Sequence, residues 1–176
     1  MRFIAKTATV AAALGGLLAL GLGPARAAVP SGPGAAPTAV TPNGFGATGP
    51  IYATSYSHQS GTGKGTTAGG FSYVGWISNG DWIEFDNVNF FSTPLSHIKI
   101  EAAQWLSGST EVHLDSLSNA PVATISGPLS GNSGVYLDQN GTLNTGVTGY
   151  HTVYLRFTTP NTKHDFLNVE WFQFSS

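Results

Sequence analysis

Cysteine is absent from this 176-residue chain, and charged side chains are scarce. Without cysteine neither a disulfide nor a thiolate metal site can form, so a hydrophobic core must hold the fold together. Only 9% of the residues are charged, Lys and Arg together number seven, and the formal net charge is -2. Nucleic acids and anionic lipids attract basic surfaces, so we expect no nucleic-acid partner and no membrane partner.

Long apolar runs are absent beyond the N-terminal region. Arg2 and Lys6 precede a run rich in Ala, Leu and Gly that ends at Leu22, and Ala25-Arg26-Ala27 follows it. This order is typical of a secretory signal peptide, so we expect residues 1–27 to be removed on export. The run is shorter than the roughly 20 residues that a membrane-spanning helix needs. The mature protein is therefore expected to be secreted and extracellular.

Large apolar residues are also rare between residues 28 and 46, where Ala, Pro, Gly, Ser and Thr dominate. Such a segment buries too little apolar surface to offset the entropy of ordering it, so we interpret it as a leader or linker. Residues 47–176 remain, which is enough for one domain with a real core. We expect this domain to be a monomer.

Short segments with alternating apolar and polar residues make up the rest of the chain. Residues 98–101 alternate Ile with Lys and Glu, residues 111–115 place His113 on a polar face, and residues 152–157 keep the same period. Alternation of this kind is typical of strands with one buried face. Further strands are expected at residues 51–56, 81–87, 122–126, 134–138 and 167–174. We predict an all-β fold, an antiparallel β-sandwich of jelly-roll type.

Two tryptophans, Trp76 and Trp82, stand on either side of Asn79-Gly80. If this pair is the turn of a two-residue hairpin, the two indoles lie on opposite faces. The alternation after the turn places Ile83 and Phe85 inward and Trp82 outward, among carboxylates. An outward tryptophan is unexpected for core packing, although a large aromatic residue is more often packed than held out for a ligand.

Three sequence blocks together resemble the family 6 carbohydrate-binding modules. They are "ATSYSHQSG" at residues 53–61, "VGWISNGDWIEF" at residues 74–85 and "FLNVEWFQF" at residues 166–174. The resemblance implies a β-sandwich with two possible sugar sites, one among the loops at one end and one on the face of a sheet. It also implies a polysaccharide or oligosaccharide as the partner.

The resemblance implies that Trp76 stacks on a sugar ring in the loop-end site and that Asn168 binds its hydroxyls. Both roles suit the ligand, because an indole covers the C–H face of a pyranose and an amide both donates and accepts hydrogen bonds. The family's second loop aromatic is missing, and Tyr136 is the nearest candidate. On the sheet face the resemblance points to Trp82, with Glu111 as its partner. We assign Trp105 and Trp171 to packing.

No cofactor is expected. The family's structural calcium uses acidic side chains, but Tyr52 and Thr54 stand at the first pair of positions and only Glu170 lies near the last strand. Calcium prefers oxygen ligands that include carboxylates, so we expect no calcium here. The five histidines show no HxxH or HExxH spacing, and no zinc site is predicted from such a motif.

Three functions stay open at this point. The sequence favours a non-catalytic protein that binds neutral plant or microbial cell-wall glycans, such as xylan or β-glucan. A secreted structural or adhesion domain with a degenerate sugar site is the second reading, since the loop tryptophan is missing. A small glycoside hydrolase is the third, because two facing carboxylates suffice for one; the candidates are Asp81, Glu84, Glu111 and Asp115.

Overall fold

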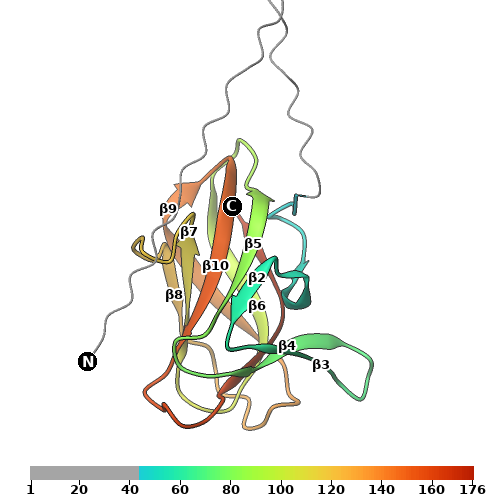
Figure 1. Ribbon diagram of the computed structural model, residues 1–176. Helices are drawn as coiled ribbons and strands as arrows, with labels where there is room; N and C mark the ends of the chain where they lie inside the picture. The colour runs from blue at the N-terminus through green and yellow to red at the C-terminus, as the bar shows by residue number, and fades with distance from the viewer. Residues whose placement is uncertain (1–43) are drawn as a thin grey trace, which may run out of the picture. The chain divides into compact units, whose positions relative to one another are not determined.

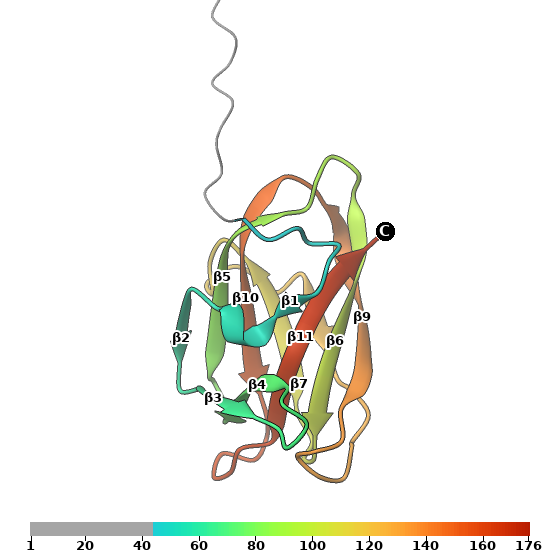
Figure 2. The same cartoon turned by 90° about the vertical axis from the view of Figure 1, so that its right-hand side faces the viewer.

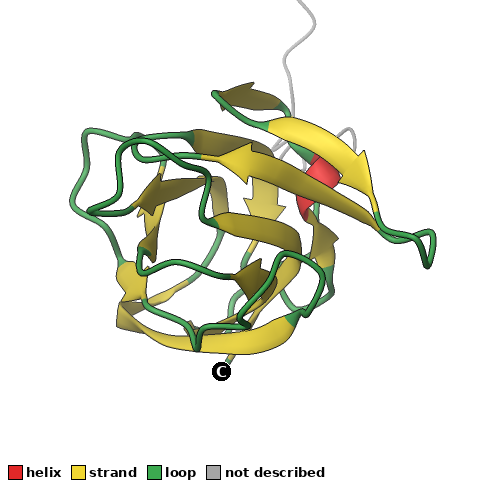
Figure 3. Ribbon diagram, turned by 90° about the horizontal axis from the view of Figure 1, so that it is seen from below, coloured by secondary structure: helices red, strands yellow, loops and turns green. Residues whose placement is uncertain are grey.

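Two antiparallel sheets lie face to face in the computed structural model, which describes residues 44–176 (Figure 1, Figure 3). The predicted β-sandwich is confirmed. The five-stranded sheet has the order β2 (His58–Ser60), β5 (Trp82–Asn89), β10 (Tyr150–Thr158), β7 (Ser109–Leu114) and β8 (Ala123–Ile125). The six-stranded sheet has the order β3 (Gly63–Thr66), β4 (Ser72–Ile77), β11 (Leu167–Ser175), β6 (Leu95–Gln104) and β9 (Leu137–Val147). Its sixth strand, β1 (Ile51–Tyr52), also pairs with β11, and a 3-10 turn, η1 (Ala53–Ser55), follows it.

The predicted signal peptide, residues 1–27, lies outside the described residues, as does the predicted leader up to residue 43. From Phe45 onward the chain contacts the sandwich. The ring centroid of Phe45 lies 6.0 Å from that of Phe85, and Gly46 forms a bridge with Asn89. None of the helices in the described part of the chain has the length and apolar character needed to cross a membrane.

The core lies between the sheets and consists of the residues that the alternation assigned to buried faces. On β10, Val153, Leu155 and Phe157 are fully buried. Phenylalanines from the two sheets meet in the middle, where the rings of Phe85 on β5 and Phe172 on β11 are 4.9 Å apart, centroid to centroid. Because apolar side chains project from both inner faces, neither sheet is stable without the other.

The Asn79-Gly80 pair forms a turn, but the hairpin interpretation is wrong. β4 before the turn belongs to the six-stranded sheet and β5 after it to the five-stranded sheet, so the turn carries the chain between layers. The amide of Asp81 donates to the carbonyl oxygen of Ser78 at 3.3 Å. Gly80 has a φ of 91°, a left-handed conformation that glycine adopts without steric cost.

Two other local expectations differ from the structure. The strand expected at residues 51–56 ends at Tyr52 and continues as a 3-10 turn, and the strand expected at residues 134–138 starts at Leu137 and extends to Val147. His113 lies on the outer face with Glu111, as the alternation predicts, but it is only 2% exposed. Its Nδ1 lies 2.8 Å from the carbonyl oxygen of Asn119, and this hydrogen bond satisfies the buried ring.

One end of the sandwich gathers the elements that matter for function. In Figure 2 the first residues of β11 lie at the lower end of the molecule, next to β4 and to the loops that join the strands there. The β6–β7, β8–β9 and β10–β11 connections all reach this end, because β6 ends, β9 begins and β11 begins there. Rigid strands therefore position the loops.

We expect Phe172→Ala to cost about 3–5 kcal/mol of unfolding free energy, because the removed ring leaves a cavity between the sheets. Phe71→Ala serves as the control, since Phe71 is 62% exposed and its loss should cost far less. Urea denaturation followed by tryptophan fluorescence measures both values. Equal losses in the two variants would contradict this account of the core.

Candidate functional site

A β-bulge creates the central feature of the loop end. The register of β4 against β11 shifts between Leu167 and Val169, so that two residues of β4, Gly75 and Trp76, stand opposite the single residue Asn168. A bulge bends its strand and redirects a side chain that simple alternation would place elsewhere. Here it turns the indole of Trp76 outward while keeping its backbone beside Asn168.

Trp76 lies in a strained backbone conformation on this bulge. Its φ is 57°, in the left-handed region that a bulky side chain rarely adopts, and 57% of the residue is exposed. Tyr73 supports the indole from one side, with ring centroids 6.4 Å apart and an angle of 26° between the planes. More than half of the residue is thus accessible to a ligand, and such strain is concentrated at functional sites in proteins.

Asn168 presents its amide next to this indole. The residue is 6% exposed, and its Nδ2 donates to the carbonyl oxygen of Ser133 at 3.1 Å. This bond fixes the amide plane, and the structure gives Oδ1 no donor among the described side chains. Gly75 makes room for the arrangement, because a Cβ atom at this position would lie 2.6 Å from Oδ1 of Asn168. The oxygen Oδ1 therefore remains as an acceptor for a ligand, while the amide nitrogen also faces the Tyr136 hydroxyl.

The indole and the amide share an open cavity of about 510 Å³. Its lining residues come from β4, from the start of β11 and from three loops: Tyr73, Trp76, Trp105, Gly131, Asn132, Ser133, Asp165 and Asn168. Trp105 is half-buried and follows the last residue of β6, so a second indole contributes to the same cavity. A cavity with aromatic walls and a few polar groups is suited to a small uncharged ligand.

Tyr136 does not line this cavity. It contributes to a neighbouring cavity of about 470 Å³, together with Phe71, Tyr73 and Glu170. Its ring contacts Tyr73 at 6.5 Å, and burial raises the pKa of its hydroxyl to about 12. The hydroxyl is buried beside the Asn168 amide, which acts on its pKa in the opposite direction. Tyr136 therefore supports Tyr73, which in turn supports Trp76.

Trp82 belongs to a different surface. It lies half-buried on β5 in the five-stranded sheet, and its ring meets Tyr154 edge-on at 5.9 Å. Arg156 of β10 pairs with Trp82 on one side and with Glu111 on the other, so the three residues form a row across the sheet. The carboxylate of Glu111 lies 3.8 Å from the Arg156 guanidinium. The structure thus brings Trp76 and Asn168 together and keeps Trp82 apart from them.

Sequence reasoning missed Trp105, Tyr73 and Asp165 as parts of the site. Trp105 was assigned to packing, although it directly follows a strand and precedes Leu106-Ser107-Gly108, which is typical of an exposed loop. A further cavity of about 510 Å³ at this end, lined mainly by Ser, Thr and Gly, has no aromatic ring in its lining. The Trp76 cavity, by contrast, combines a stacking surface with an ordered amide.

Comparison with known proteins agrees with this geometry. The sequence model of Carbohydrate binding module (family 6) matches residues 52–176. This chain belongs to that family. A solved family 6 module from Clostridium cellulolyticum, in complex with xylose, is 33% identical to this module with a TM-score of 0.69, and the match covers 74% of this chain and 99% of that chain. A β-1,3-glucan-binding family 6 module from Bacillus halodurans is 26% identical with a TM-score of 0.70, over 76% of this chain and all of that chain (100%).

A curated relative places such a module within a larger enzyme. An arabinoxylan arabinofuranohydrolase from Bacillus subtilis (strain 168) is 34% identical to this module over 117 residues, which are 65% of this chain. The same alignment covers 22% of that enzyme, so this chain corresponds to about a fifth of it.

We expect the free energy of unfolding of Trp76→Gly to exceed that of Trp76→Ala by about 1–2 kcal/mol, because only glycine relieves the strain of the left-handed backbone conformation. Both variants lose the same side-chain contacts, so the comparison isolates the backbone. Urea denaturation at constant pH gives the two free energies. If Trp76→Ala is as stable as Trp76→Gly, the backbone at this bulge is not strained.

Proposed function

We propose that this module binds neutral polysaccharides or oligosaccharides at the loop end, without catalysing their cleavage. The observation that carries the proposal is the bulge that holds the exposed indole of Trp76 beside the ordered amide of Asn168. A pyranose ring needs both groups at once, because its C–H face stacks on an aromatic ring while its hydroxyls need directional partners. A secreted protein would meet such polymers outside the cell.

Charge in the site supports an uncharged ligand. Asp165 is the one ionisable acid or base, tyrosine aside, among the described residues that line the cavity, and a single carboxylate can accept hydrogen bonds from sugar hydroxyls. A polyanionic glycan would be repelled by this carboxylate, since none of the lining residues within 44–176 is a Lys or Arg that could offset its charge. The β8–β9 loop contributes only Gly131, Asn132 and Ser133 to the cavity, so Trp105 of the β6–β7 loop provides the second aromatic surface.

Two relatives indicate the glycan class to test first. One solved family 6 module holds xylose, and another binds β-1,3-glucan. We infer that this module takes a neutral β-linked cell-wall glycan of the xylan or β-glucan type. A curated relative that acts on arabinoxylan is consistent with that choice.

The four carboxylates considered for hydrolysis support binding rather than catalysis. None of them lines the Trp76 cavity. Asp81 accepts a hydrogen bond from the Ser78 amide at 2.8 Å, and Asp115 accepts one from the Thr152 amide at 3.1 Å, so both hold the backbone. Glu111 lies beside Arg156. This distribution does not resemble two acids that flank one glycosidic bond.

Loss of Trp76 or Asn168 is expected to weaken sugar binding. After pull-down on insoluble xylan, cellulose and β-1,3-glucan selects the polymer, calorimetric titration of the matching oligosaccharide measures the affinity. We expect Trp76→Ala to cost about 1–3 kcal/mol of binding free energy through lost stacking, and Asn168→Ala about 1–2 kcal/mol through unpaired hydroxyls. Trp171→Ala is a matched control, because Trp171 is half-buried on β11 outside the cavity.

Two outcomes would contradict this site. Unchanged affinity in folded Trp76→Ala and Asn168→Ala variants would place the ligand elsewhere on the module. Failure of the wild-type protein to bind any glycan would favour the structural or adhesive reading, and release of reducing sugar from a polymer would show an enzyme instead.

Trp82 should contribute little to binding at the loop end. Its side chain lies on the five-stranded sheet and does not line the Trp76 cavity. In the same titration Trp82→Ala is expected to leave the affinity for the selected oligosaccharide within about 0.5 kcal/mol of wild type. A folded Trp82→Ala protein that no longer binds would show that the sheet face is the principal sugar site.

A further inference from the structure

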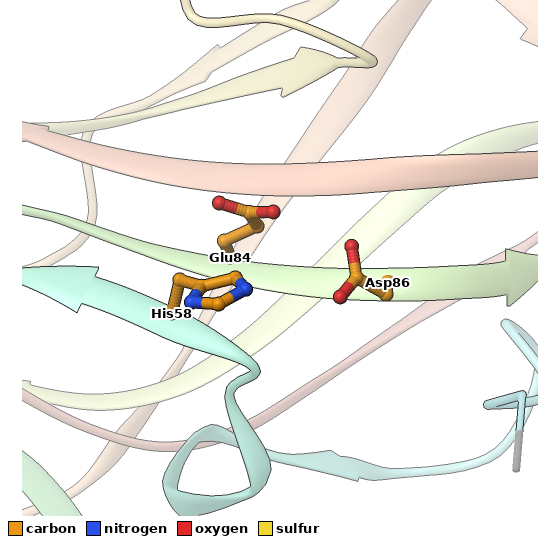
Figure 4. Close-up of side chains that lie close together, drawn as sticks. All are labelled: His58, Glu84 and Asp86. Atoms are coloured by element: carbon orange, nitrogen blue, oxygen red, sulfur yellow. The ribbon is translucent and has the colours of Figure 1, made fainter. Parts of the chain in front are cut away.

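Three potential metal ligands converge on the outer face of the five-stranded sheet, away from the sugar cavity. They are His58 on β2 and Glu84 and Asp86 on β5 (Figure 4). One ligand atom from each residue lies within 4.8 Å of the other two. Ligand atoms bound to one Zn²⁺ ion are roughly 3–3.5 Å apart, so small side-chain rotations bring the three groups into coordination distance.

The strand pairing explains why these side chains meet. His58 stands directly opposite Glu84 in the antiparallel pair of β2 and β5, which places their Cβ atoms close together on one face. The amide of Ser57 donates to the carbonyl oxygen of Glu84 at 2.7 Å, and the amide of Asp86 donates to Oγ of Ser57 at 3.2 Å. The backbone at all three ligand positions is therefore fixed.

A second β-bulge positions Asp86. The register of β5 against β10 shifts between His151 and Val153, which leaves Asp86 and Asn87 opposite Thr152. Asn87 has a φ of 55°, a left-handed conformation that asparagine tolerates better than most residues. Asp86 stays half-buried on the outer face after this bend, on the same side of the sheet as Glu84.

The electrostatics of the cluster favour a bound cation. Neither Glu84 nor Asp86 takes part in an ion pair with Lys or Arg within residues 44–176. Tyr154 on β10 faces Glu84 and carries no positive charge. Two carboxylates thus face each other with one imidazole beside them.

We propose that His58, Glu84 and Asp86 bind a divalent first-row transition-metal ion of the Zn²⁺ type. An imidazole nitrogen with two carboxylates suits Zn²⁺, Cu²⁺ or Ni²⁺, whereas Ca²⁺ and Mg²⁺ prefer all-oxygen ligands. Three protein ligands leave at least one coordination position for water. The site is distinct from the positions of Tyr52, Thr54 and Glu170, which lie on β1, η1 and β11.

Calorimetric titration of ZnCl₂ into the protein, prepared without a polyhistidine tag, tests the proposal. We expect one saturable site whose affinity falls by about tenfold or more in each of His58→Ala, Glu84→Gln and Asp86→Asn. His97→Ala is the matched control, because His97 is an exposed strand histidine outside the cluster, and its affinity for Zn²⁺ should equal that of wild type. Circular dichroism establishes that each variant is folded.

A fluorescence measurement locates the ion independently. Trp82 lies two residues before Glu84 on the same face, so Cu²⁺ bound to the cluster should quench its emission. Quenching should be saturable in wild type, lost in His58→Ala and much reduced in Trp82→Phe. Absence of a saturable Zn²⁺ site, equal affinity in wild type and His58→Ala, or quenching that persists in Trp82→Phe would each overturn the proposal. Tight Ca²⁺ binding that is indifferent to His58→Ala would show an oxygen-only site instead.

Discussion

The β-bulge at Gly75 and Trp76 is the constraint on which the candidate sugar site depends. A regular strand would alternate these side chains across the sheet, and Trp76 would have to share the core or lie flat on the outer face. The extra residue opposite Asn168 lets the indole leave the sheet at its end while the backbone stays hydrogen-bonded to β11. Gly75 permits this because a side chain at that position would collide with Oδ1 of Asn168 and with the Tyr73 ring.

The residues around Trp76 are also held in place by their neighbours. Tyr136 packs on Tyr73, and Tyr73 packs on Trp76, so two tyrosine rings support the indole that forms the binding surface. Asn168 is held by the Ser133 carbonyl group from the β8–β9 loop. A site that is already ordered loses little conformational entropy when it binds, which matters for a ligand that offers few strong interactions.

The sequence predicted the layers of this fold better than their connections. Two-residue alternation identified the buried faces of β5, β6 and β10 because a strand with one dry face leaves a local, regular pattern. The sequence predicted a turn at Asn79-Gly80 and suggested a hairpin, since the turn's chemistry is the same whether the next strand joins the same sheet or the opposite one. The burial of His113 on its otherwise polar face was not predicted, because a hydrogen bond to the Asn119 carbonyl oxygen leaves no periodic signal.

The candidate sugar site was also predicted only in part, because it depends on contacts between distant parts of the sequence. Trp76 and Asn168 were found through a resemblance in two sequence blocks, and the bulge that joins them is a matter of register between strands about 90 positions apart. Trp105 was missed because its role depends on where the β6–β7 loop lies relative to β4, and local sequence does not determine that. Positions set by long-range pairing cannot be derived from periodicity alone.

Both candidate sites use bulges, and their chemistry differs because of the surface on which each bulge lies. At the end of the six-stranded sheet the bulge exposes an aromatic ring in a cavity with one carboxylate, which suits a neutral ligand. On the five-stranded sheet the second bulge holds Asp86 near Glu84 and His58, where negative charge accumulates. A chain with so few charged residues that still places two acids side by side gains nothing from that pair in stability, since like charges repel. A bound cation removes the repulsion, and this is the physical reason for assigning the cluster to a metal rather than to the fold.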